Sequence, residues 1–132
     1  MPLQIGDSAE RTTRITDERI RLFAQVSGDD NSIHLDDEAA RASRFGRRIA
    51  HGMLTASLVS AVLGCDLPGV GSIYLSQTVK FKAPVFLDDV ITARVTVTAY
   101  RPDKRIATLE TLCLNQDGQI VLEGEAVVIA PA

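Results

Sequence analysis

The sequence contains only two histidines, His34 and His51, and each lies beside residues that could assist chemistry. His34 follows a segment rich in Gly, Asp and Asn, in which the Asp29 carboxylate precedes the imidazole by five residues. A bend of this composition can fold both side chains toward one substrate. Because imidazole titrates near neutral pH, the pair could move protons to or from a water molecule or a carbon acid. A solvated turn in which Asp29 only caps backbone N–H groups is the alternative reading of the same pattern.

The second histidine lies in an apolar segment, residues 49–65, that contains no Asp, Glu, Lys or Arg. The first N–H groups of a helix lack internal partners and carry partial positive charge. Gly52 has no side chain to block approach, so its N–H could stabilise an oxyanion that develops from a carbonyl group. Alternatively, Gly52 only permits close packing and His51 makes a local hydrogen bond. Since a membrane span needs about 20 apolar residues, we expect a helix buried in protein rather than in a bilayer.

Other kinds of site find little support in the sequence. No HxxxH or CxxC spacing indicates a metal, no glycine-rich phosphate loop is present, and no GxSxG marks a serine nucleophile. The 14 Lys and Arg against 17 Asp and Glu give a net charge of −3, which argues against nucleic acid as a partner. Arg44, Arg47 and Arg48 could form a local patch for an anionic ligand, although solvated charge is the better explanation of these residues.

The cysteines and the N-terminus bear on the compartment. Cys65 and Cys113 are too few for a disulfide framework, and both have apolar neighbours. We therefore expect buried thiols in a reducing environment. The first residues have neither a basic region nor an apolar region typical of a secretory signal, so we expect a cytoplasmic protein.

The elements that must position these residues form one domain over residues 1–132, a length that suits a single hydrophobic core. A weak strand pattern covers residues 4–15. A helix should follow Thr16, which supplies an N-cap oxygen, and end at Gly28. A short helix is expected over residues 36–43 with Asp36 as its cap, and a long one over residues 52–64. Because the long helix is apolar around nearly its whole circumference, we expect protein on most of its sides.

The second half of the chain alternates with a period of two residues, which predicts strands. Ile91, Ala93, Val95, Val97 and Ala99 should point to one face. Turn signals at residues 88–89, 101–104 and 115–118 separate four successive strands, which would form an antiparallel meander. The pattern therefore predicts an α+β fold in which a curved antiparallel sheet wraps around one long buried helix.

Two runs resemble the MaoC-like, (R)-specific enoyl-CoA hydratases: FAQVSGDDNSIHLD at residues 23–36 and RIAHGMLTASL at residues 48–58. GSIYLSQ at residues 71–77 and KFKAPVFLDD at residues 80–89 are also similar to that family. The resemblance covers nearly the whole chain, and the two paired motifs occur in the usual order and separation.

This resemblance implies a hot-dog fold and a homodimer whose two sheets join edge to edge. It implies reversible syn addition of water to a trans-2-enoyl-CoA, giving the (R)-3-hydroxyacyl-CoA, without a metal or a redox cofactor. The family's catalytic pair falls on Asp29 and His34, and its oxyanion-hole N–H falls on Gly52. Asn31, His51 and Ser60 fall on further positions of the substrate-binding site. We assign Asp29 as the base toward water and His34 as the proton donor, and the reverse assignment stays open because the pair can titrate as a unit.

Two departures from the family pattern concern the loop. Ser32 stands where the family commonly has proline, which could make the loop less rigid. Asp30 stands where an apolar or aromatic residue is frequent, and it either approaches Asp29 or faces water.

Rival activities also stay open. They are a hot-dog hydratase or dehydratase acting on a carrier-protein thioester or a branched enoyl-CoA, a hot-dog thioesterase, and a non-catalytic acyl-thioester binder. The sequence does not fix the acyl-chain length, nor does it choose between polyester precursor supply and fatty-acid degradation.

Overall fold

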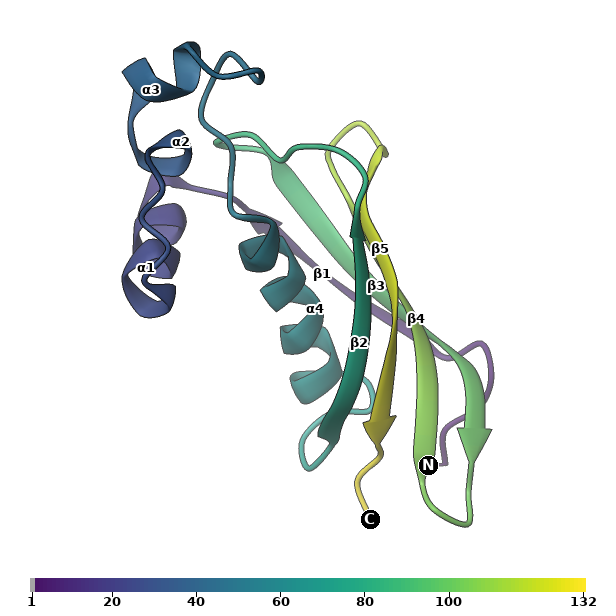
Figure 1. Cartoon of the computed structure of the whole chain (residues 1–132). Helices are drawn as coiled ribbons and strands as arrows, with labels where there is room; N and C mark the ends of the chain where they lie inside the picture. The colour runs from purple at the N-terminus through teal and green to yellow at the C-terminus, as the bar shows by residue number, and fades with distance from the viewer. Residues whose placement is uncertain (1) are drawn as a thin grey trace.

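The computed structural model describes residues 2–132, and Met1 lies outside the described residues. The elements in chain order are β1 (Ser8–Arg14), α1 (Asp17–Ser27), α2 (Ser32–Leu35), α3 (Asp37–Arg41), α4 (Gly52–Cys65), β2 (Ile73–Phe81), β3 (Val90–Arg101), β4 (Ile106–Leu114) and β5 (Ile120–Ile129). The sheet runs along one side of α4, and α1 to α3 lie beside the end at which α4 begins (Figure 1). The expected α+β arrangement of a curved antiparallel sheet around a long helix is confirmed.

The strand order is β1-β3-β4-β5-β2, and every neighbouring pair is antiparallel. Strands β3, β4 and β5 form a meander, but the prediction that β2 belongs to it is wrong because β2 pairs with β5. Residues 82–89 therefore cross from β2 at one edge to β3, next to the other edge. A period-two pattern identifies a strand without specifying its partner, so the sequence alone could not place β2.

The alternation in β3 is confirmed for its first part. Ile91, Ala93, Val95 and Val97 are buried against the helix side of the sheet, whereas Ala99 is exposed. The register of β3 against β4 shifts between Val97 and Ala99, which is a β-bulge. Because one extra residue reverses the facing of every later side chain, the bulge explains why Ala99 points outward.

Only one face of α4 is buried in the chain. That face carries Leu54, Thr55, Val59, Val62 and Leu63, which pack into the core with the inward residues of the strands. On the other face Met53 is 59% exposed, so the expectation of protein on most sides is not met within one chain. An apolar helix face indicates that the face is covered from solvent, but it does not indicate whether the same chain or another molecule covers it.

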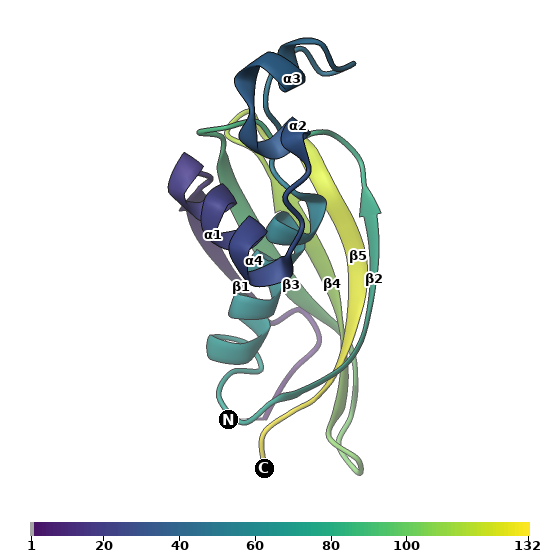
Figure 2. The ribbon, with the colours of Figure 1, turned by 60° about the vertical axis from the view of Figure 1, so that its left-hand side comes forward.

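The expected helix ends are confirmed where side-chain caps specify them. Thr16 accepts a hydrogen bond from the Arg19 N–H at the start of α1, and Gly28 ends that helix in the left-handed region at φ 82°. Asp36 caps α3 by accepting from the Glu38 N–H. Helix α2 was not predicted, because its four residues are too few to show a hydrophobic period. Figure 2 shows α2 and α3 beyond the N-terminal end of α4.

Two further expectations are tested by the structure. Cys113 is buried as predicted, and burial raises the pKa of its thiol to about 12. Cys65, at the end of α4, is exposed, so the prediction that it is buried is wrong. Apolar neighbours in sequence do not bury a residue in the last turn of a helix, because successive helical positions face different directions.

Among residues 2–132, no helix has both the length and the apolar character needed to cross a bilayer.

Gly124 lies where β5 contacts β2 most closely, since a Cβ at this position would stand 1.8 Å from the Thr78 carbonyl oxygen. We predict that Gly124→Ala lowers the free energy of unfolding in urea by about 2 kcal/mol or more, because β2 must move away from β5. The matched control is Gly64→Ala in α4, where an added Cβ meets nothing within 4 Å. The control should raise the free energy of unfolding by about 0.5–1 kcal/mol, and equal effects of the two variants would contradict the assigned contact.

Candidate active site

Asp29 lies in the loop between α1 and α2, where short polar contacts define its position. Its N–H donates to Ser27 Oγ at 3.1 Å, and its Oδ1 accepts from the Asn31 N–H at 3.3 Å. The Asn31 side chain in turn accepts from the Ile33 N–H and so caps α2. Within this loop, Asn31 caps α2 while Asp29 exposes a carboxylate. The alternative reading, in which Asp29 caps backbone N–H groups, is thus correct for its Oδ1 atom.

His34 is buried in α2, and its ring is held at one nitrogen. Nδ1 lies 2.7 Å from the Ile49 carbonyl oxygen. Because a carbonyl oxygen can only accept, Nδ1 carries the proton, which leaves the Nε2 lone pair of a neutral ring free. Burial is the largest influence on this group and lowers its pKa, while the Ile49 carbonyl and the Asp29 charge act in the opposite direction. A neutral imidazole with an open Nε2 is therefore the favoured form near pH 7.

His51 immediately precedes α4 and is only 2% exposed. Its Nε2–H donates to the Asp29 backbone carbonyl at 2.8 Å. Its ring stacks on His34 with a centroid distance of 3.9 Å and also contacts Phe23 at 4.9 Å. These contacts join the loop residue Asp29, the helix α2 and the start of α4 into one unit, so His51 holds these three parts of the site together.

Gly52 is the first residue of α4, and its N–H has no acceptor among residues 2–132. A Cβ at this position would stand 2.7 Å from Cε1 of the Phe81 ring. The glycine thus lets an aromatic ring cover the start of the helix while the helix N–H stays available.

The structure brings Asp29, His34, His51 and Gly52 to one cavity of about 510 Å³. Its remaining lining residues are mostly apolar, with two cationic side chains among them: Arg44, Phe45, Ile49, Ala50, Met53, Thr55, Phe81, Lys82, Ala83, Pro84, Val85 and Val121. A carboxylate, an imidazole and an unpaired helix N–H in one cavity can together move a proton and stabilise an oxyanion.

Three of these side chains carry atoms of the kind that bind metal ions. Asp29, His34 and His51 each offer one ligand atom, and the three atoms lie within 4.8 Å of one another. The two rings, however, are stacked with an interplanar angle of 26°, so their in-plane lone pairs run side by side rather than toward one point. Nε2 of His51 is also already paired with the Asp29 carbonyl. The geometry suits proton transfer better than tetrahedral metal binding.

The remaining sequence-predicted residues lie elsewhere. Asn31 contacts the loop and α2 rather than the cavity, and Ser60 lies two turns along α4 from Gly52, roughly 12 Å by the helical rise. Asp30 is exposed, so the structure favours the reading in which it faces water. Ser32 occupies the first position of α2, where proline is also well accommodated, so this departure keeps the same helix start.

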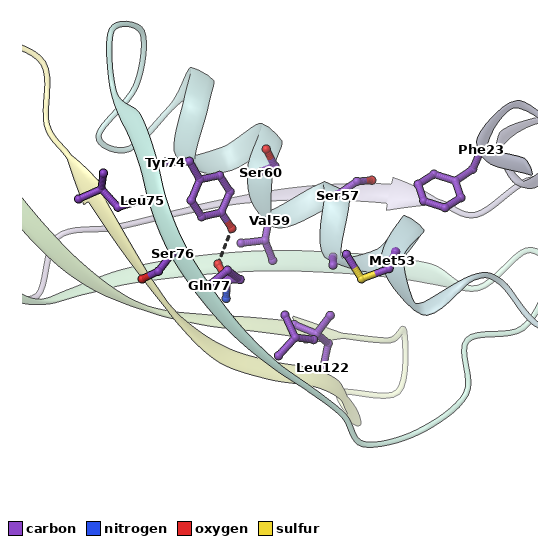
Figure 3. A pocket seen from close by; sticks show the side chains of 12 residues that line it. Phe23, Met53, Ser57, Val59, Ser60, Tyr74, Leu75, Ser76, Gln77 and Leu122 are labelled. Atoms are coloured by element: carbon purple, nitrogen blue, oxygen red, sulfur yellow. Dashed lines mark hydrogen bonds between the residues drawn. The ribbon is translucent and has the colours of Figure 1, made fainter. Parts of the chain in front are cut away.

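A second cavity, of about 480 Å³, lies between α4 and β2 and contains Ser60 (Figure 3). It is mainly apolar, and Met53 borders both cavities. On its β2 side, the Tyr74 hydroxyl donates to Gln77 Oε1, and Gln77 Nε2 donates to the buried Thr111 hydroxyl at 2.9 Å. Sequence reasoning missed Tyr74 and Gln77. Polar atoms within a strand facing an apolar helix are the signal that could have identified them.

The chain is similar to known proteins over most of its length. The family model described as "MaoC like domain" matches residues 4–115. The (R)-specific enoyl-CoA hydratase of Rhodospirillum rubrum is 48% identical over 127 residues, covering 96% of this chain and 88% of the relative.

Two solved structures are also similar over most of their length. The (R)-hydratase from Aeromonas caviae involved in PHA biosynthesis superposes with a TM-score of 0.95 at 49% identity, covering 98% of both chains. The unliganded R-hydratase from Pseudomonas aeruginosa gives a TM-score of 0.94 at 43% identity, covering 98% of this chain and 83% of that one. With a family model that matches most of its length and relatives this similar, the chain belongs to the family of MaoC-like domains, and its fold is the hot-dog fold.

Proposed function

We propose that the protein is an (R)-specific enoyl-CoA hydratase, a hydro-lyase that reversibly adds water to trans-2-enoyl-CoA to give (R)-3-hydroxyacyl-CoA. The observation that carries this proposal is the proximity of the Asp29 carboxylate and a ring nitrogen of His34, within 4.8 Å, in the cavity that also contains Gly52. One water molecule can bridge two groups at that separation, since each hydrogen bond spans roughly 2.8 Å. The near full-length similarity to named (R)-specific hydratases supports the same activity.

The tautomer of His34 supports a particular division of roles. With Nδ1–H directed to the Ile49 carbonyl, neutral His34 offers only a lone pair at Nε2, so it can accept a proton from water but cannot donate one. We therefore favour the assignment opposite to the one first expected from the sequence: His34 is the base, and Asp29 orients the water and stabilises the imidazolium that forms. Asp29 already acts on His34 in this direction, since its charge raises the pKa that burial lowers.

The proposed reaction balances with one water molecule. Nε2 of His34 takes a proton as the water oxygen forms a bond to C3, and the π electrons of the double bond move onto the thioester oxygen as an enolate. The Gly52 N–H at the start of α4 would stabilise this negative charge. The enolate then collapses as the imidazolium returns its proton to C2. Because both new bonds form from the side that faces His34, addition is syn. No electrons leave the substrate, so the reaction needs no redox cofactor.

We also propose a homodimer formed through the edge strand β2. The other edge strand, β1, is protected by charge, since Arg11 pairs with Asp66 and Arg94 of β3 pairs with Glu10. In β2, by contrast, Ile73 and Leu75 are 56% and 51% exposed. A long apolar edge is the part of a sheet that invites pairing with another chain.

Further parts of the proposal concern the chain's setting. One core cluster reaches from Ile15 to Val128, which supports a single domain for residues 1–132. The free thiols Cys65 and Cys113 fit a reducing, cytoplasmic environment. The named role of the Aeromonas caviae relative in PHA biosynthesis favours supply of polyester precursors over fatty-acid degradation.

The activity is tested with crotonyl-CoA by following the loss of enoyl absorbance. We expect hydration to an (R)-3-hydroxy product without release of free CoA, and Asp29→Asn and His34→Ala should each lower kcat by at least about 100-fold. The control is Asp30→Asn, which alters an exposed neighbouring carboxylate and should leave kcat unchanged. Release of free CoA would instead indicate a thioesterase, and no reaction at any chain length would indicate a binder. A folded Asp29→Asn variant with normal kcat would remove the role given to Asp29.

The pH profile distinguishes the two assignments of base and donor. If neutral His34 accepts the proton, kcat/KM for hydration should be constant at neutral pH and fall about tenfold per pH unit below the pKa of His34, which burial holds under its ordinary value of about 6.5. Hydration should therefore remain fast at pH 7–8. A rate that instead falls as the pH rises through this range would show that imidazolium is the reactive form and that Asp29 is the base.

The dimer is tested by sedimentation velocity. We predict that Leu75→Glu shifts the protein toward monomer, because a charge would be buried in the joined sheet edge. Ile5→Glu is the matched control, since Ile5 is equally apolar and 72% exposed but lies away from β2. Dissociation by Ile5→Glu but not by Leu75→Glu, or a monomeric parent protein, would contradict the proposed edge.

A further inference from the structure

Arg48 is a buried cation beside the candidate active site, although the sequence placed it in a basic surface patch. Its side chain is only 6% exposed. Nε donates to the His34 backbone carbonyl at 2.7 Å, and a terminal nitrogen donates to Asp17 Oδ1 at 2.5 Å. A guanidinium removed from water is costly unless its charge and its N–H groups are paired. Arg48 therefore belongs to a built arrangement rather than to a solvated surface.

Asp17 is well placed to hold this cation. It is the first residue of α1, where the helix N-terminus favours negative charge, and Arg21 contacts the same carboxylate at 2.9 Å. These contacts lower the pKa of Asp17, with the hydrogen bond from Arg48 as the largest cause. The carboxylate is thus ionised and fixed to a stable helix, so it can hold the guanidinium at a defined place.

His34 depends on such tertiary contacts for its orientation. Helix α2 has four residues, and a single helical turn is not stable by itself in water. The strap formed by residues 48–50 supplies the missing support: Ile49 N–H donates to the Ile33 carbonyl at 3.4 Å, and the Ile49 carbonyl receives the His34 ring. Arg48 adds the third contact, at the carbonyl of His34 itself. The strap in turn is anchored to residues 82–89, the segment that crosses from β2 to β3. There, Ala50 N–H donates to the Val85 carbonyl at 2.7 Å.

We propose that Arg48, held by Asp17, is a positioning residue that fixes the direction of the His34 imidazole for proton transfer. Arg48 does not line the cavity, so it acts on the reaction through His34 and not on the substrate. The planar guanidinium has several N–H groups, so it can donate to the His34 carbonyl and the Asp17 carboxylate at the same time. Lysine has a single nitrogen and is less suited to holding both acceptors in this geometry. This inference rests on the proposed hydratase function of His34.

The test compares Arg48→Met and Arg48→Lys with the parent protein in crotonyl-CoA hydration. A small displacement of a catalytic group can cost up to about 100-fold in rate, so we expect kcat to fall at least about tenfold in Arg48→Met, with KM within twofold. Arg48→Lys should recover only part of that loss. Nuclear magnetic resonance of the His34 ring gives a second measure: exchange of the Nδ1–H with solvent should be at least about tenfold faster in Arg48→Met, since the bond to the Ile49 carbonyl opens more often.

Arg94→Met is the matched control, because it removes an arginine–carboxylate pair of the same kind, with Glu10, on the exposed side of the sheet. It should leave kcat and the His34 signal unchanged. If Arg48→Met does not fold, Asp17→Asn provides a milder change. It keeps the contact of Arg48 with the His34 carbonyl and weakens the ion pair that holds the guanidinium. We expect this variant to lower kcat several-fold without changing KM.

His34→Ala separates the two levels of the proposal. Loss of activity in His34→Ala together with normal kcat and a normal His34 Nδ1–H exchange rate in folded Arg48→Met would overturn the positioning role alone. Normal activity in folded His34→Ala would overturn the proposed hydratase mechanism itself.

Discussion

The hydrogen bond from the His34 ring to the Ile49 carbonyl is the interaction on which the rest of the site depends. It fixes which ring nitrogen carries the proton, and so leaves the lone pair of the neutral ring at Nε2. It also joins two parts of the chain that each lack independent stability, a single-turn helix and an extended strap. This contact therefore links the protonation of the imidazole to the position of α2, in the way that a hydrogen bond at one ring nitrogen orients histidines in other proteins.

The sheet contributes to the site indirectly, through the route its chain takes. Because β2 pairs with β5 at the far edge, residues 82–89 must return toward β3, and on the way they pass the strap that precedes α4. The bridge between Ile49 and Phe86 and the bond from Ala50 to Val85 fix the strap to this crossing segment. Phe81, at the end of β2, covers Gly52. The strand order that differs from a simple meander is thus what surrounds the start of α4 with protein.

Helix α4 divides two kinds of environment. Its first turn borders a cavity that contains the ionisable groups Asp29, His34 and Lys82, whereas its outer face borders a mainly apolar cavity next to β2. Met53 stands between them. An acyl thioester, the class of substrate proposed for this protein, also has a polar reacting end and an apolar chain. Met53 on the outer face of α4 is exposed, so this mostly apolar helix is only partly covered by its own chain.

The sequence by itself determined the local features of this protein. The caps at Thr16 and Asp36, the stop at Gly28, the inward face of β3 up to Val97 and the proximity of Asp29 to His34 all depend on neighbours within a few residues, so local patterns suffice to predict them. Only the tertiary structure decided the partner of β2, the burial of Arg48, the exposure of Cys65 and the tautomer of His34. Each of these depends on contacts between residues distant in sequence, and the same side chain takes a different state according to what the fold places beside it.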